Sequence, residues 1–122
     1  MKFGSLNDLF IDQLKDIYSA EKQIIQALPK MAQAASRPEL QQAFQEHLNQ
    51  TQTQKARLDQ IFEQLGTTPG RKKCVGMEGV LSEGDELLKE GGSSDVLDAG
   101  LIAAAQKVEH YEIASYGTLR TY

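Results

Sequence analysis

The stretch FIDQLKDIYSAEKQIIQALPKMAQAA, residues 10–35, decides the fold. It carries seven apolar side chains and one acid at alternating spacings of four and three residues: Phe10, Leu14, Ile17, Glu21, Ile24, Leu28, Met31 and Ala35. This spacing places all eight on one face of an amphipathic α-helix. Ser5, three residues before Asp8, is expected to cap the first turn. Pro29 lacks an amide hydrogen, so we expect a kink in the turn before it.

A second helix is expected directly afterwards. Residues 36–39 (SRPE) have the spacing of a capping box, with Ser36 as the cap and a proline in the first turn. One face of this helix is apolar at both ends and polar in the middle: Leu40, Phe44, His47, Thr51, Gln54, Leu58, Ile61 and Leu65. Gly66 is predicted to end it. An antiparallel hairpin turning near Ser36 places Glu21 level with residues 50–54, so the polar interruptions of the two helices coincide.

The remaining sequence predicts a loop, a short helix and a third long helix. Residues 67–73 (TTPGRKK) indicate the loop, and residues 74–90 a short helix that tertiary packing must hold, because its three interior glycines disfavour helix. Residues 91–94 (GGSS) break the chain again. From Asp95 a long helix runs to Tyr122 with no signal for its end. We therefore expect the domain to be C-terminally incomplete.

Length and composition limit the class of protein. The 122 residues suit a single domain, residues 1–122, and the net charge is −4. Lysine and arginine are scattered along the sequence, which gives no indication of nucleic-acid binding. Cys74 is the only cysteine and is interpreted as a small hydrophobe. Without an export signal or an apolar run long enough for a membrane span, we expect a cytoplasmic protein with no membrane partner.

Glu109 and Glu112 are candidates for chemistry because they are neighbours on one helix face within an apolar stripe. Buried carboxyls take up a proton, pair with a donor or coordinate a metal. Glutamates on facing helices, including such a pair, are how helical bundles hold two iron or manganese ions. We expect Glu21, Glu109 and Glu112 to converge in the interior, either as metal ligands or paired with nearby side chains, of which the candidates are Lys22, Lys107, Arg57, Tyr18 and Tyr111.

The histidines and the polar tract of the second helix are weaker candidates. His47 is interpreted as a hydrogen-bonded core residue in preference to a metal ligand, and His110 as solvated. Residues 49–54 (NQTQTQ) are interpreted as partly interior and partly solvent-facing. The sequence has no glycine-rich phosphate loop, nucleophile elbow or Cys-x-x-Cys motif, so it gives no support to nucleotide chemistry, acyl transfer or dithiol redox chemistry.

Two segments, DIYSAEKQIIQAL (16–28) and AAAQKVEHYEIASYGTL (103–119), resemble the YciE/YciF-like bacterial stress proteins, a branch of the ferritin-like superfamily. The segments AFQEHLNQT and KCVGMEG extend this likeness. The resemblance implies a ferritin-like antiparallel four-helix bundle with a short extra helix, whose fourth long helix would follow Tyr122 and is absent from this sequence. It also implies a homodimer and similarity to the di-iron protein rubrerythrin. It matches Glu21, Glu109 and Glu112 to acidic positions of the superfamily's metal centre. Family members usually carry glutamate at Gln50 and often an acid at Asn49, so this chain lacks an expected ligand.

The leading interpretation is a stress-response protein with a vestigial or incomplete carboxylate metal site and no assigned reaction. One alternative is a di-iron or di-manganese oxidoreductase that acts on oxygen or peroxide. Another is a purely structural or partner-binding bundle. The cofactor is accordingly iron, manganese or none. Three long helices leave one groove open, so we expect a longer chain or an oligomer to cover it.

Overall fold

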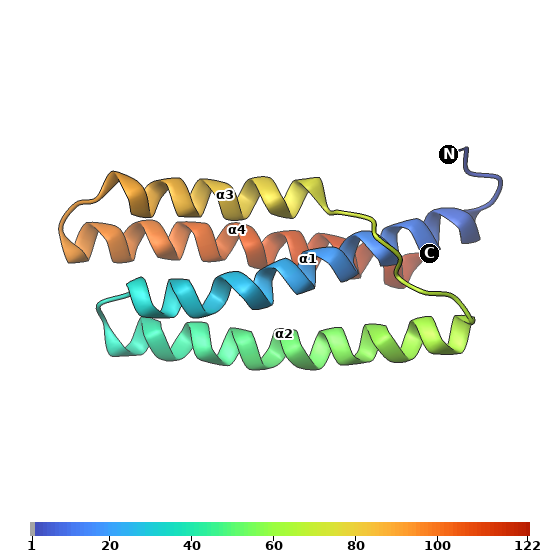
Figure 1. Cartoon of the computed structure of the whole chain (residues 1–122), viewed down its shortest axis with the longest axis horizontal. Helices are drawn as coiled ribbons and strands as arrows, with labels where there is room; N and C mark the ends of the chain where they lie inside the picture. Colours follow the sequence, from blue (N-terminus) through green and yellow to red (C-terminus); the bar gives the residue numbers. More distant parts are fainter. Residues whose placement is uncertain (1) are drawn as a thin grey trace.

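The computed structural model describes residues 2–122, which form four α-helices and no strand. The long helices are α1 (Leu6–Ala34), α2 (Pro38–Leu65) and α4 (Ser94–Thr121), and the short one is α3 (Val75–Glu90). α1 and α2 form one antiparallel hairpin, α3 and α4 form another, and the hairpins meet at α1 (Figure 1). The predicted all-α helical bundle is confirmed. Within the described residues, no helix combines the length and apolar character needed to cross a membrane.

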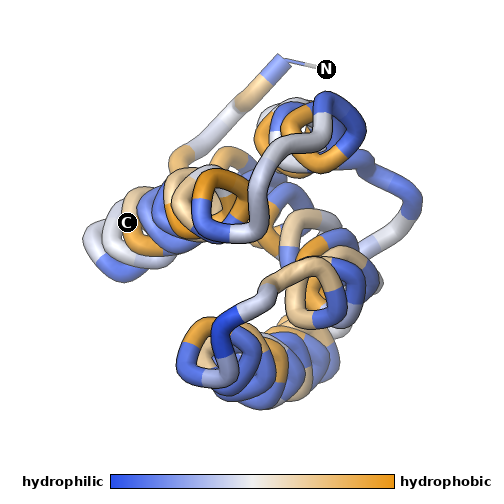
Figure 2. The backbone as a smooth tube through the Cα atoms, turned by 90° about the vertical axis from the view of Figure 1, so that its left-hand side faces the viewer, coloured by the Kyte–Doolittle hydropathy of each residue, from blue (hydrophilic) through white to orange (hydrophobic). Residues whose placement is uncertain are grey.

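The face predicted for residues 10–35 forms the centre of the core. Seven of its eight members are buried, and Phe10 is half-buried against them. α1 packs along α2, α3 and α4, and Figure 2 views it end on between α2 below and the other two helices above. The helix runs on through Pro29 to Ala34, so this proline does not end it. Ser5 caps α1 as predicted, because its Oγ accepts a hydrogen bond from the Asp8 amide at 3.1 Å.

The cap of α2 differs from the sequence prediction. The N-cap residue is Arg37, whose side chain makes no capping bond, and Ser36 does not form a capping box. The turn is instead held by Asp98 of α4, a buried residue. Its carboxylate accepts hydrogen bonds from the Ser36 amide at 2.8 Å, the Ser36 hydroxyl at 2.8 Å and the Arg37 amide at 3.1 Å. A carboxylate from another helix therefore replaces the local cap, which spacing within one segment cannot reveal.

Glycines fix how α2 ends and how α3 lies on α4. Gly66 ends α2 with φ of 68°, in the left-handed region where glycine is favoured, as predicted. A Cβ at Gly76 would lie 2.9 Å from the Tyr111 ring, and one at Gly84 would lie 3.3 Å from Ala104 Cβ. Glycines in α3 thus permit close approach to α4, which supports the prediction that tertiary packing holds this helix.

Candidate carboxylate site

A polar layer crosses the bundle at mid-height, where the sequence placed the interruptions of α1 and α2. Glu21 takes one position of the α1 core face between Ile17 and Ile24, and its side chain is fully buried. Opposite it, α2 contributes His47, Thr51 and Gln54, and α4 contributes Glu112 and Tyr116. The predicted level of Glu21 with residues 50–54 is confirmed, because the Gln54 amide reaches its carboxyl group.

Gln54 and Tyr116 satisfy the two buried carboxyls. With its amide nitrogen turned toward them, Gln54 donates to Glu21 Oε2 at 2.6 Å and to Glu112 Oε2 at 3.0 Å. The Tyr116 hydroxyl donates to Glu21 Oε2 at 3.0 Å. None of the candidate partners Lys22, Lys107, Arg57, Tyr18 and Tyr111 makes these bonds. That expectation was wrong, and neutral donors on the core faces take their place.

His47 links the buried layer to its rim. Its Nε2 lies 2.8 Å from Glu112 Oε1, and its Nδ1 lies 4.0 Å from Glu109 Oε1. Glu112 accepts a hydrogen bond from the imidazolium and carries the opposite charge, so it raises the pKa of His47 above the usual value. The interpretation of His47 as a hydrogen-bonded core residue is confirmed, and His110 is exposed as expected.

Glu21 is held in its neutral form. Burial, followed by the adjacent carboxyl of Glu112, raises the pKa of Glu21 to about 9. Its Oε1 is buried without a hydrogen-bond partner among the described residues. A proton on Glu21 removes the repulsion between the two carboxyls. The arrangement can therefore store a proton between a carboxylic acid and a carboxylate.

Glu109 does not join the interior, which corrects the sequence expectation. Its side chain is 48% exposed, whereas that of Glu112 is 9% exposed. Three residues of helix turn the two side chains about 60° apart. As a result Glu112 reaches the buried donors His47 and Gln54, and Glu109 lies at the edge of a groove of about 640 Å³ between α2 and α4 that both glutamates line. Gln50, Arg57, Leu58, Ile61, Ile113 and Tyr116 also line this groove.

The residues present do not fit a complete metal centre. No group of three or more His, Cys, Asp or Glu side chains among residues 2–122 is arranged to hold an ion. Hydrogen-bond donors already occupy Glu21 Oε2 and both oxygens of Glu112. Gln50, at the position where the family resemblance implies a glutamate, is exposed in the groove. Of the three predicted ligands, the fold brings Glu21 and Glu112 together and leaves Glu109 at the rim.

Cys74 belongs to a second polar cluster at the start of α3. It is fully buried, which suits a small hydrophobe, but its Sγ also caps α3 by accepting from the Met77 amide at 3.3 Å. The Tyr111 hydroxyl lies 2.9 Å from this sulfur and donates to Asp16 Oδ2 at 2.8 Å. Burial raises the pKa of the Cys74 thiol. The cluster therefore pins α3 to α1 and α4 and contains a neutral thiol.

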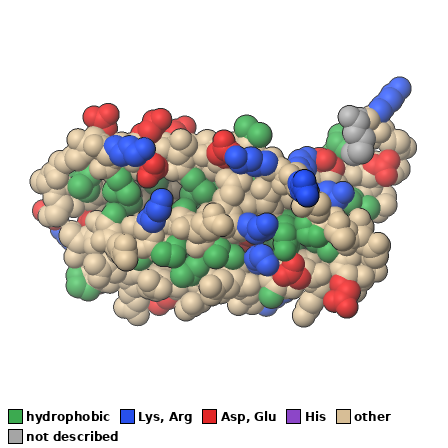
Figure 3. Space-filling model, viewed as in Figure 1, with side chains coloured by type: hydrophobic (Ala, Val, Ile, Leu, Met, Phe, Trp, Pro, Cys, Tyr) green, Lys and Arg blue, Asp and Glu red, His purple; other side chains and the backbone are tan. Residues whose placement is uncertain are grey.

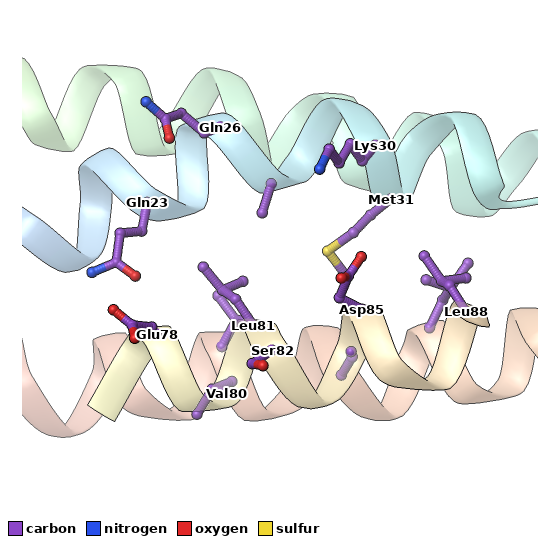
Figure 4. A pocket seen from close by; sticks show the side chains of 15 residues that line it. Gln23, Gln26, Lys30, Met31, Glu78, Val80, Leu81, Ser82, Asp85 and Leu88 are labelled. Atoms are coloured by element: carbon purple, nitrogen blue, oxygen red, sulfur yellow. The ribbon is translucent and has the colours of Figure 1, made fainter. Parts of the chain in front are cut away.

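A hollow of about 310 Å³ lies apart from both clusters, between α1 and α3 with α4 as its floor. Met31 and Leu81 extend into it from opposite walls, and Leu88 closes one end (Figure 4). Its polar side chains stand at the edge and include Lys30 and Asp85. It shares no lining residue with the α2–α4 groove, so it contributes nothing to the carboxylate chemistry.

Comparison with known proteins agrees with this architecture. A protein-family model described as "Domain of unknown function (DUF892)" matches residues 5–122. Protein YciF of Escherichia coli (strain K12) is 51% identical over 122 residues, which cover 99% of this chain and 74% of YciF.

Two solved structures share the fold. The crystal structure of the E. coli stress protein YciF superposes with a TM-score of 0.92 at 51% identity, over 98% of this chain and 76% of that one. YcfI from Rhodopseudomonas palustris superposes with a TM-score of 0.91 at 46% identity, over 97% of this chain and 78% of that one.

Proposed function

The chain belongs to the DUF892 family, and we propose that it is a stress-response helical bundle whose carboxylate site is incomplete as a metal centre and holds a proton instead. Its relative YciF is called a stress protein, and YcfI is provisionally described as a structural protein. Neither description includes a reaction. We assign none, and we place the protein in the cytoplasm as a homodimer.

The observation that carries this proposal is the way the two buried glutamates are satisfied. Three of their four oxygens accept from Tyr116, Gln54 or His47, all of which are protein donors. A metal ion would have to displace these bonds. The raised pKa of Glu21, about 9, means that the remaining oxygen is part of a neutral acid at pH 7. Protonation thus supplies the charge balance that an ion supplies in bundles with a complete ligand set.

One observation favours a second candidate, the di-iron or di-manganese oxidoreductase. Glu21 Oε1 is a buried acceptor without a partner, and carboxylate oxygens are ligands that iron and manganese accept. In that function Glu21, Glu109 and Glu112 would hold the metal, which would supply redox chemistry toward oxygen or peroxide. A third candidate, a purely structural bundle, needs the polar layer only to specify packing.

The metal content of matched variants tests the proposal. Wild type, Gln50→Glu and Gln52→Glu are purified without chelator from cells supplied with iron and manganese. Gln50→Glu adds a carboxylate in the groove, at the position where the family resemblance implies one, and Gln52→Glu adds one elsewhere on the exposed surface of α2 as a control. We expect wild type and Gln52→Glu to hold far less than one ion per chain and Gln50→Glu to hold more.

The other outcomes separate the candidates. Stoichiometric iron or manganese in wild type, lost in Glu21→Gln and Glu112→Gln, would overturn the proposal in favour of the oxidoreductase. Metal-free protein in wild type and both variants, with a Glu21 that titrates as an ordinary exposed acid, would favour the purely structural bundle.

A further inference from the structure

Basic side chains that are scattered in the sequence gather on one face of the fold. Six of the thirteen lysines and arginines surround two adjoining hollows at the place where the α2–α3 connection crosses α1: Lys15, Lys22, Lys55, Arg71, Lys72 and Lys73. Figure 3 shows blue side chains grouped on this face. This concentration of positive charge stands out in a chain whose net charge is −4.

Three of these cations have carboxylate partners and three do not. Lys55 pairs with Asp59 at 3.2 Å, Lys72 pairs with Asp12 at 2.7 Å, and Lys73 pairs with Glu78. Lys15, Lys22 and Arg71 form no ion pair with any described residue. Lys22 and Lys55 also lie over the Tyr18 ring, 5.9 and 5.2 Å from its centroid. The face therefore carries three cations without an ion-pair partner among the described residues, of which Lys15 also helps to lower the pKa of the nearby Asp12 carboxyl.

The hollow that holds the unpaired cations is concave and preformed. It has a volume of about 350 Å³, with Lys15 and Lys22 on the α1 wall and Arg71 on the connection opposite. Two bonds to α1 fix the end of that connection. The Cys74 amide donates to Ser19 Oγ at 2.9 Å, and the Gln23 side chain donates to the Cys74 carbonyl at 3.1 Å. The Lys72–Asp12 pair adds a third tie, so the two walls are held at a fixed separation.

We propose that this hollow binds a small, multiply charged phosphorylated anion through Lys15, Lys22 and Arg71. Two lysines and an arginine on opposing walls suit a ligand with several phosphate oxygens, since arginine binds phosphate through paired hydrogen bonds and lysine as a point charge. A long polyanion or an anionic membrane would also meet the acidic remainder of the protein, which repels it. The confined volume and the net charge together favour a small ligand.

Calorimetric titration of the full chain with inorganic tripolyphosphate tests this site. The test variant is Lys15→Gln/Lys22→Gln/Arg71→Gln. The matched control is Lys2→Gln/Lys30→Gln/Arg120→Gln, which removes the same charge from exposed positions outside the hollow. We expect wild type and the control to bind within about twofold of each other. The test variant should bind at least about a hundredfold more weakly, because a hydrogen bond to a charged group is worth about tenfold in affinity.

Several results would overturn the proposal. Equal losses in the test and control variants would mean that only net charge matters, and no binding by folded wild type would mean that there is no site. Two further arms use a short DNA duplex and vesicles of phosphatidylcholine with phosphatidylserine. If wild type binds either of these more tightly than tripolyphosphate, and the test variant abolishes that binding, the ligand of this face is a nucleic acid or a membrane and not a small anion. Circular dichroism confirms that each variant remains folded.

Discussion

Glu21 illustrates how one residue sets the character of the bundle. It holds a position where every neighbour on its helix face is apolar, and its burial is maintained by Gln54, Tyr116 and a bound proton. Maintaining that proton at neutral pH costs free energy, because an unfolded glutamate would ionise. The buried titratable group at this position therefore lowers the free energy of unfolding at neutral pH.

Replacing Glu21 with glutamine should stabilise the protein by about 1 to 3 kcal/mol at pH 7, because the amide is neutral without binding a proton. The pKa of Glu21 is about 9 in the folded state and near 4.5 when unperturbed, so between these pH values the folded state binds the extra proton. Rising pH thus destabilises wild type across this window. The advantage of Glu21→Gln should be largest near pH 9 and vanish toward pH 4.5.

Urea denaturation of wild type and Glu21→Gln at a series of pH values measures this difference. Glu109→Gln is the matched control, and since Glu109 is half-exposed it should shift stability by less than about 0.5 kcal/mol. A Glu21→Gln variant that is less stable than wild type at every pH would contradict the buried acid, and loss of bound iron with it would indicate a metal ligand.

His47→Ala should destabilise the protein by about 1 to 3 kcal/mol, because it leaves the buried Glu112 carboxylate without its donor. The folded pKa of His47 is raised, so its contribution is complete below pH 6.5 and is lost as pH rises through the folded value. His110→Ala is the matched control. His110 is exposed and makes none of these contacts, so its replacement should change thermal unfolding little. Equal effects of the two substitutions would contradict the role given to His47.

The sequence predicted part of this site. Glu21 and the polar centre of α2 stood out because they interrupt apolar faces, and hairpin symmetry placed them at one level. Spacing alone could not separate Glu109 from Glu112, since that depends on which neighbour α4 faces. The sequence did not predict that Gln54 and Tyr116 donate to the buried carboxyls, because these contacts form only where three helices meet.

At the scale of the elements, helix positions followed from periodicity, and errors arose where distant segments meet. The α2 cap is the clearest case, because Asp98 lies about sixty positions away from the turn it holds, and no local pattern connects them. The stability of α3 also depends on a contact between distant segments. Its glycines weaken it as an isolated helix, but Gly76 and Gly84 allow it to approach α4.

Two glycines of α3 should respond in opposite ways to alanine. Gly79→Ala should stabilise by up to about 1 kcal/mol, because nothing lies within 4 Å of the new Cβ and alanine favours helix. Gly76→Ala should destabilise, because its Cβ would lie 2.9 Å from the Tyr111 ring and disturb the bond from Tyr111 to Asp16. Thermal unfolding of both variants measures the effect, and stabilisation by Gly76→Ala would refute the close α3–α4 packing.

At the scale of the whole molecule, the groove between α2 and α4 is the surface that we propose a partner covers. Ile113 lines it with 64% of its surface exposed, next to Leu58, Ile61 and Tyr116. An exposed isoleucine beside other apolar side chains, with polar residues such as Gln50 and Arg57 around them, is typical of a surface that a partner covers. We propose a second copy as the partner, as the family resemblance implies.

Ile113→Asn should weaken the dimer, because it places an amide in the apolar part of the groove. Val96→Asn is the matched control, since Val96 is equally exposed but lies outside the groove. Light scattering over a dilution series of residues 1–122 should show dimer for wild type and Val96→Asn, and a shift to monomer for Ile113→Asn. A wild-type chain that remains monomeric and folded at all concentrations would contradict the proposed homodimer.

The basic cluster around the α2–α3 connection forms only in the folded molecule. Lys15, Lys22 and Arg71 are separated by up to 56 positions of sequence and looked scattered, yet the α2–α3 connection brings them around one hollow. Charge clusters formed by a crossing connection depend on the path of the loop, which hydrophobic periodicity does not determine.

The protonation state of Glu21 shows whether the buried carboxyl pair holds a proton or a metal ion. In protein labelled with ¹³C, the side-chain carboxyl resonance that is missing from Glu21→Gln is assigned to Glu21 and followed through a pH titration. We predict that this carboxyl titrates with a midpoint near 9 and is neutral at pH 7, and that added iron or manganese leaves the titration unchanged. A midpoint near the ordinary value of 4.5, or a resonance abolished by stoichiometric metal, would contradict a proton held on Glu21.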